Sequence, residues 1–112
     1  MQYLLQIYSD ENGFDEIPEA QREAISAEYF AISDRPGVTG GAQLQPAATA
    51  TTVRVQNGST LTTDGPFAET KEVLVGYYLF EADDLDAAIE TAAAIPAARL
   101  GGAVEVRPLV ER

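Results

Sequence analysis

The sequence predicts an α+β fold in which two helices cover one face of an antiparallel sheet. Two segments have the apolar spacing and end signals of helices, and they alternate with short segments rich in branched and aromatic residues. A further observation is Asn57-Gly58, the strongest short signal for a two-residue hairpin turn, which separates two such short segments. We therefore expect a sheet with two helices and one inserted β-hairpin.

In the first half of the chain, a strand is expected over Tyr3–Tyr8. The first helix should begin near Ile17-Pro18-Glu19, because proline suits the first helical position and the acid complements the helix dipole. It should end near Ser33, before Pro36-Gly37. Two glycines then lead into a short strand, Ala42–Leu44.

In the second half, the hairpin strands are expected at Thr51–Gln56 and Ser59–Thr63, and the longest strand at Glu72–Glu81. The second helix should begin after a capping aspartate in Asp83-Asp84 and stop at Pro96. Its expected apolar face is Leu85, Ala88, Ile89, Ala92 and Ile95. A last strand, Ala103–Pro108, alternates apolar and charged residues.

Apart from the hairpin, the predicted order is strand, helix, strand, strand, helix, strand. That order is the split βαβ, ferredoxin-like arrangement, within one domain over residues 1–112. In this fold the second sheet face is open, and strands that meet water should alternate apolar and polar residues. The longest strand does not alternate: Val73, Val75, Tyr77 and Leu79 are expected on one side, and Leu74, Tyr78 and Phe80 on the other.

Leaving such side chains in water forfeits about 1.5–3 kcal/mol each. We therefore expect a homodimer in which two sheets pack together as a dimeric α+β barrel. The alternative is that the hairpin or the C-terminal residues fold over the open face.

The charge balance limits the kinds of partner. The chain has 112 residues, with 18 Asp and Glu against 7 Lys and Arg, a formal net charge of −11 at pH 7. Nucleic acids and anionic membranes repel such a surface, so neither is expected as a partner. The acids gather in Asp10–Asp34 and Glu81–Glu90, which we interpret as solvated helix faces, with an acidic docking surface as the alternative.

The residue types that are absent limit the chemistry. The chain has no cysteine and no histidine, which excludes disulfides, thiol nucleophiles and the usual zinc sites. We expect no metal, no cofactor and a location in the reducing cytoplasm. The apolar run at Tyr3–Tyr8 is too short to cross a membrane and no basic segment precedes it, so it is interpreted as a strand.

The segment Asp64-Gly65-Pro66-Phe67-Ala68-Glu69-Thr70-Lys71-Glu72 resembles the signature of the DGPF domain, a branch of the YCII-related family. Further similarity lies at Gly40-Gly41, Leu44-Gln45-Pro46, Ala50-Thr51-Thr52-Val53-Arg54, Gly76-Tyr77-Tyr78 and Val104-Glu105-Val106-Arg107-Pro108. The resemblance implies the dimeric α+β barrel fold. It also implies a sigma-factor-type protein partner, because some relatives are fused to or lie beside such factors. The histidine–aspartate pair of YCII-type proteins does not carry over, because this chain has no histidine.

Asp64 is the first candidate site residue, with two interpretations. In one it caps a rigid Asp-Gly-Pro turn through backbone N–H groups, with Phe67 anchoring the turn in the core. In the other it lies at the mouth of a pocket between the sheet and the first helix, as a general acid or base. Glu28 falls inside the expected apolar arc of the first helix, which consists of Ala20, Ala24, Ile25, Ala27, Ala31 and Ile32. It should find a partner, reach water, or serve as a second pocket acid opposite Asp64.

Four residues are candidates for binding a ligand. Tyr8 and Tyr77 can donate hydrogen bonds into a pocket, although aromatic residues in strands are commonly core residues. Arg54 can hold an anionic ligand or be an exposed hairpin residue, and Lys71 can pair with a carboxylate. Two functions follow: a homodimeric module that binds a small molecule or a regulatory protein, or a cofactor-independent lyase, isomerase or hydrolase that uses Asp64.

Overall fold

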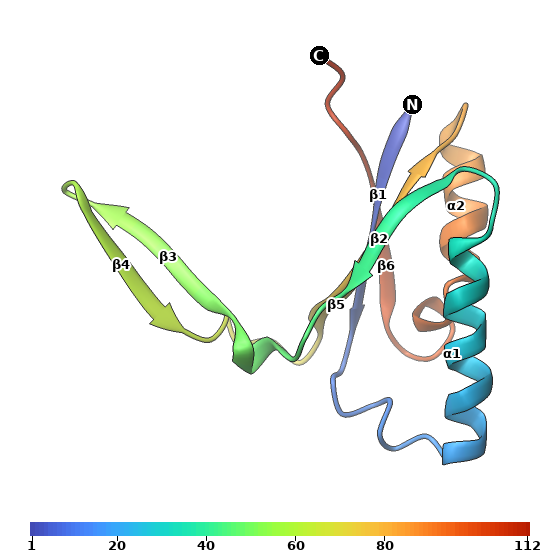
Figure 1. Ribbon diagram of the computed structural model, residues 1–112, viewed down its shortest axis with the longest axis horizontal. Coiled ribbons are helices and arrows are strands. Elements are labelled where there is room, and N and C mark those ends of the chain that lie inside the picture. Colours follow the sequence, from blue (N-terminus) through green and yellow to red (C-terminus); the bar gives the residue numbers. More distant parts are fainter.

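Four strands form one antiparallel sheet, and two helices lie together on one of its faces (Figure 1). The computed structural model describes every residue from Met1 to Arg112. The elements are β1 (Gln2–Ser9), α1 (Glu19–Ser33), β2 (Val38–Gln43), β3 (Thr51–Gln56), β4 (Ser59–Asp64), β5 (Val73–Glu81), α2 (Leu85–Ala94) and β6 (Ala103–Pro108), with short 3₁₀ turns η1 (Ala47–Thr49) and η2 (Pro96–Ala98). The strand order β2-β5-β1-β6 confirms the predicted ferredoxin-like α+β fold.

The core lies between this sheet and the helices. From the sheet, Tyr3 and Leu5 of β1 and Phe80 of β5 point into it and are at most 5 % exposed. From the other layer come Ile32 of α1 and Ile95, the residue after α2. Burial of these large side chains removes apolar area from water, which is the main favourable contribution to folding.

The helices are rotated from the predicted apolar arcs. In α1 the buried residues are Ile25 and Ile32, whereas Ala20, Ala24, Ala27 and Ala31 are exposed. In α2, Leu85 and Ile89 are about half exposed and Thr91 is buried instead. In α1 the short alanine side chains contribute little to either face, so Ile25 and Ile32 set the rotation. In α2 it is the small residues Ala88, Thr91 and Ala92 that are buried.

Strand β2 begins earlier than predicted. It runs over Val38–Gln43 rather than Ala42–Leu44, so that Gly40 and Gly41 lie inside the strand. Gly41 has a φ of 154°, and a Cβ there would lie 2.5 Å from the carbonyl oxygen of Tyr77. The glycines therefore allow β2 to approach β5 closely, and they do not mark the end of a loop.

An irregularity in the β1–β5 pairing changes which residues face each side. Ile7 pairs with Gly76 but Tyr8 pairs with Leu74, which leaves Val75 without a partner in the ladder. As a result Leu74 joins Tyr77 on the side away from the helices, while Val75 packs against the core. The strict alternation predicted for this strand is therefore wrong for the residues that precede Gly76.

The sheet face away from the helices is called the open face below. By pairing and alternation it consists of thirteen residues: Gln2, Leu4, Gln6, Tyr8, Gly40, Ala42, Leu74, Tyr77, Leu79, Glu81, Ala103, Glu105 and Arg107. The five large side chains among them (Leu4, Tyr8, Leu74, Tyr77 and Leu79) are only partly buried within the single chain. Each keeps part of its apolar surface in water, as the sequence predicted.

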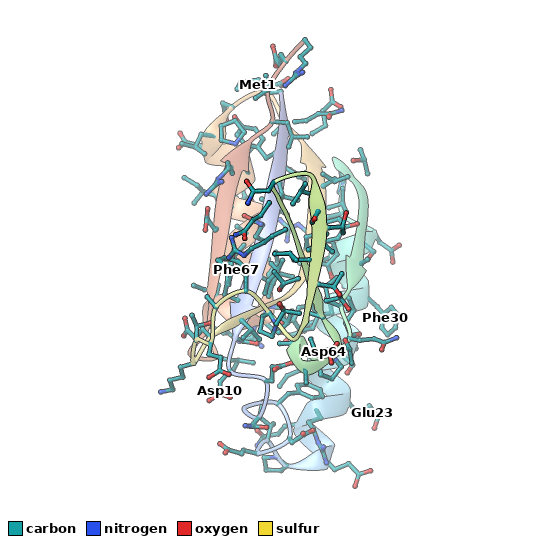
Figure 2. The ribbon with its side chains drawn as sticks, turned by 90° about the vertical axis from the view of Figure 1, so that its left-hand side faces the viewer. Met1, Asp10, Glu23, Phe30, Asp64 and Phe67 are labelled. Carbon is teal, nitrogen blue, oxygen red and sulfur yellow. The ribbon has the colours of Figure 1, made fainter.

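Strands β3 and β4 form the predicted hairpin, which is called the arm below (residues 51–64). Its turn has positive φ at Asn57 (51°) and Gly58 (78°), as a type I′ turn requires. The arm does not fold over the open face. Figure 1 shows it leaving the body and forming one side of a V with the sheet, and Figure 2 shows it running in front of that sheet. The arm raises the radius of gyration to 16.0 Å, against about 13 Å for a compact chain of this length.

Candidate functional site

A cleft lies between α1 and the edge of the sheet formed by β2 and β5. It has a volume of about 640 Å³, and nine of its 19 lining residues are hydrophobic. The loop that follows β1 contributes Phe14, α1 contributes Phe30, and the chain after β2 contributes Leu44. Phe14 and Phe30 are 42 % and 76 % exposed, so their rings lie outside the core. The cleft therefore has an apolar wall formed by three separate segments.

The polar groups of the cleft are amides and acids. Asn12, Gln43 and Gln45 line it, and their side chains can both donate and accept hydrogen bonds. Glu11 and Asp15 also line it, whereas no lysine or arginine does. The carboxylate of Glu11 accepts a hydrogen bond of 2.7 Å from the backbone N–H of Ala47. Asp15 lies 3.8 Å from the guanidinium of Arg22. The electrostatic environment of the cleft is therefore unfavourable for an anion.

Two tyrosines connect the cleft to the core. The hydroxyl of Tyr78 donates a hydrogen bond of 2.9 Å to the carbonyl oxygen of Tyr29, which joins β5 to α1. Burial raises the pKa of Tyr78, against the opposing effect of a hydrogen bond with Ser33. Burial likewise raises the pKa of Tyr29, and a hydrogen bond with the backbone of Ala97 acts in the opposite direction. Both hydroxyls therefore remain protonated at neutral pH, as hydrogen-bond donors and not as bases.

The raised pKa values predict a loss of stability at alkaline pH. Above about pH 10, the value of 10.0 that applies to an unperturbed tyrosine, the unfolded chain releases these phenol protons while the folded chain keeps them. The free energy of unfolding should therefore fall as the pH rises from 10 towards the folded-state pKa values. In a Tyr29→Phe/Tyr78→Phe variant, denaturant titrations from pH 8 to 11 should show a smaller slope. A slope equal to that of the unmodified chain would contradict the assignment.

Asp64 lies at the base of the arm, outside the cleft. It lines a separate shallow depression of about 530 Å³ together with Glu11, Glu69 and Gly65. Its side chain is exposed, and no hydrogen bond to its carboxylate is present in the structure. The turn is instead held by the hydroxyl of Thr52, which donates to the carbonyl oxygen of Gly65 at 2.8 Å. The N–H of Gly65 donates to Ala50 at 2.7 Å.

Another expectation for this segment is not met in the single chain. Phe67 is 81 % exposed and does not anchor the turn in the core (Figure 2). The chain from Asp64 to Glu72 follows the arm and runs outside the main sheet, so no core surface reaches the ring. Gly65 has a positive φ of 93°, a backbone conformation that glycine adopts readily.

Glu28 has found a partner away from Asp64. Its carboxylate accepts a hydrogen bond of 2.5 Å from Arg99, which follows η2. The two side chains are 44 % and 50 % exposed, so the pair lies at the rim of the α1–η2 contact. Glu28 lines neither the cleft nor the depression beside Asp64. The structure therefore does not bring the two acids together.

The four expected ligand-binding residues are dispersed. Tyr8 and Tyr77 both lie on the open face, and Tyr77 also lines the cleft. Arg54 is exposed on the arm, and Lys71 is exposed in the segment between the arm and β5. Sequence reasoning missed the aromatic and amide residues of the cleft. The available signal was weak: Phe14 and Phe30 are bulky apolar residues that interrupt polar or acidic segments.

The hydrogen bond from Thr52 predicts which residue secures the base of the arm. Replacing Thr52 by valine keeps the shape and strand preference but removes the hydroxyl. The free energy of unfolding should fall by about 0.5–1.5 kcal/mol, the usual net contribution of one hydrogen bond. Asp64→Asn should change it by less than about 0.5 kcal/mol, because the carboxylate makes no contact to lose. Urea titrations of both variants provide the measurement, and a larger loss in Asp64→Asn would restore Asp64 as the turn cap.

Together, the fold and the cleft define a ferredoxin-like α+β domain with a ligand-sized cleft beside its sheet. The family model of the YCII-related domain matches residues 1–112. The chain is also 36 % identical over 115 residues to "Uncharacterized protein R00369" of Rhizobium meliloti (strain 1021), which covers 97 % of this chain and 92 % of that protein. The chain therefore belongs to the YCII-related family, as its sequence predicted. Neither of its helices is long and apolar enough to cross a membrane.

Proposed function

We propose that this YCII-related chain is a ligand-binding module that works as a homodimer in the cytoplasm. The cleft between α1 and the β2–β5 edge carries the proposal. Its volume of about 640 Å³ falls within the range of roughly 300–1,000 Å³ that is typical of small-molecule sites. An apolar wall with a few amide groups is the usual composition of such sites. The assignment to the DGPF branch is compatible with this role.

The lining of the cleft favours a neutral, amphipathic ligand. Phe14, Phe30 and Leu44 offer apolar surface to one part of such a molecule, and Gln43 and Gln45 offer donors and acceptors to a polar group. An anionic ligand would meet Glu11 and Asp15 without a lysine or arginine in the lining. The anion-binding role considered for Arg54 and Lys71 is therefore no part of this proposal.

The open face supports the homodimer. Its five large side chains remain partly wet, and fully burying a large apolar side chain contributes about 1.5–3 kcal/mol. Covering even the remaining third of five such residues adds a few kcal/mol, a large fraction of a small domain's stability. A second sheet packed about 10 Å away would provide that cover for both chains at once.

The enzymatic alternative, with Asp64 as general acid or base, and the sigma-factor-type partner are not part of the proposal. Asp64 is exposed in the single chain, and low-dielectric surroundings are what would prepare a carboxylate for proton transfer near neutral pH. Glu28 is bound to Arg99 and is not available as its partner.

The proposed ligand class is tested with two probes that differ in charge. Phenylacetamide is neutral and amphipathic, and phenylacetate has nearly the same shape with a carboxylate. In ¹⁵N-correlation NMR titrations, phenylacetamide should shift the amide signals of cleft residues such as Ser26, Phe30 and Gln43, and phenylacetate should shift them much less. Weak, millimolar binding is expected of so small a probe.

A pair of variants controls this experiment. Ser26→Phe places a bulky ring in the cleft and should abolish the shifts. Ala27→Phe places the same ring on the neighbouring exposed position of α1, outside the lining, and should leave them unchanged. Equal shifts with Ser26→Phe, or a stronger response to the carboxylate, would refute the ligand proposal.

The homodimer is tested by placing a charge on the open face. The unmodified chain should sediment at micromolar concentration with about twice its mass of 12.0 kDa. Leu79→Glu should convert it to a monomer, because the carboxylate would be buried against the partner sheet without a counter-ion. Ala93→Glu adds the same charge to an exposed position of α2 and should remain dimeric. A monomeric unmodified chain, or a dimeric Leu79→Glu variant, would refute the proposed assembly.

A further inference from the structure

The arm lacks a packing partner within its own chain. All six residues of β4 and five of the six residues of β3 are exposed. Val53, Val55 and Leu61 are 59 %, 68 % and 45 % exposed, more than the partly buried side chains of the open face. A two-stranded hairpin is only marginally stable in water unless it packs on another surface. The arm is therefore the part of this chain with the most to gain from a partner.

The two faces of the arm differ in charge. Val53 pairs with Thr62 and Val55 pairs with Thr60, so these four branched residues share one face, called the valine face below. Its only charged side chain is Asp64, which lies beside Thr51 at the base of the arm. The opposite face carries Arg54 beside Leu61, and Thr52 beside Thr63. A face of branched side chains whose single charge lies at the base of the hairpin is suited to packing against protein.

We propose that each arm packs its valine face against the second copy of this chain, so that the two protomers clasp one another. This inference rests on the proposed homodimer. The geometric basis of the clasp is the V formed by the arm and the sheet. A copy that covers the open face must lie on the arm's side of that sheet (Figures 1 and 2). Figure 2 shows the arm directly in front of the sheet that the copy would cover.

Charge favours a second copy over a different partner. The chain has a net charge of −11, yet the open face and the arm together carry only three acids and two cations. One of the acids is Glu81, at the end of β5. Glu105 and Arg107 are bonded to each other on the open face, and Arg54 and Asp64 lie on the arm. Two strongly acidic molecules can associate only through surfaces that do not repel each other, and this is such a surface.

The size of the surface also requires the arm. A stable interface takes about 20–30 residues from each partner. The open face has thirteen residues and falls short, even though its centre is apolar. The arm adds fourteen more, six from each strand and two from the turn, which brings the total into that range. Phe67, at 81 % exposure, lies beside the base of the arm and extends the same surface.

The test compares charges on the two faces of the arm. Val53→Asp/Val55→Asp puts two carboxylates on the valine face, and Gln56→Asp/Thr63→Asp puts two on the opposite face of the same hairpin. Sedimentation velocity over a concentration series gives the dimer dissociation constant of each variant. The valine-face variant should weaken the dimer by about tenfold or more, and the control should stay within about twofold of the unmodified chain.

Hydrogen exchange of the unmodified full-length chain gives a second readout that needs no substitution. Arm amides from Val53 to Thr62 should exchange slowly above the dimer dissociation constant and rapidly below it. Exchange that is rapid at both concentrations, or equal dissociation constants for both arm variants, would overturn the clasp. The Leu79→Glu variant separates the two proposals when the clasp fails. If that variant is monomeric, the homodimer stands but the arms do not clasp it. If that variant remains dimeric, the proposed homodimer itself fails.

Discussion

The structure depends on one constraint, which is that both faces of the four-stranded sheet carry large apolar side chains. Alternation along β1 sends Tyr3, Leu5 and Ile7 towards the helices and leaves Leu4 and Tyr8 on the other side. Two helices are enough to cover one face of such a sheet, and the chain has no third. A domain of this size has little other burial to offset the exposed side. The open face, the proposed assembly and the position of the arm are consequences of that shortage.

The cleft and the open face serve different needs of the molecule. The cleft is bounded by α1 and the β2–β5 edge, and its lining of aromatic and amide side chains does not depend on a second copy. The charged residues of the open face are Glu81, Glu105 and Arg107, and the last two are already bonded to each other. In the proposed dimer, a ligand would therefore be bound within one protomer, and the sheets would hold the two protomers together. The hydrogen bond from Tyr78 to Tyr29 connects the two regions through β5 and α1.

Much of the fold was predictable because its signals are local. Asn57-Gly58 identified the hairpin turn, and Pro18 and Pro96 marked where α1 begins and α2 has ended. The direction of the arm was not predictable, because no residue within it specifies how its base bends. The β1–β5 irregularity at Val75 was also missed, since it arises from pairing between distant strands.

The candidate site was less predictable than the fold. The cleft is assembled from the loop after β1, the middle of α1 and the end of β2, which no local pattern connects. The prominent motif at Asp64 predicted a site at a different place. Asp64 lies at the exposed base of the arm, where Thr52 and Gly65 hold the turn. The motif's position in this structure is therefore informative about the arm and the surface that the arm presents.

The central claim is that the open face is covered by a second copy of the chain, and direct contact across that face tests it most sharply. An isotope-filtered NMR experiment on an equal mixture of ¹³C-labelled and unlabelled chain detects only contacts between protomers. The account predicts intermolecular signals from the methyl groups of Leu4, Leu74 and Leu79, and none from Ile32 or Ile95 in the core. The account is contradicted if the mixture gives no intermolecular signal from the three open-face leucines at a concentration of several hundred micromolar.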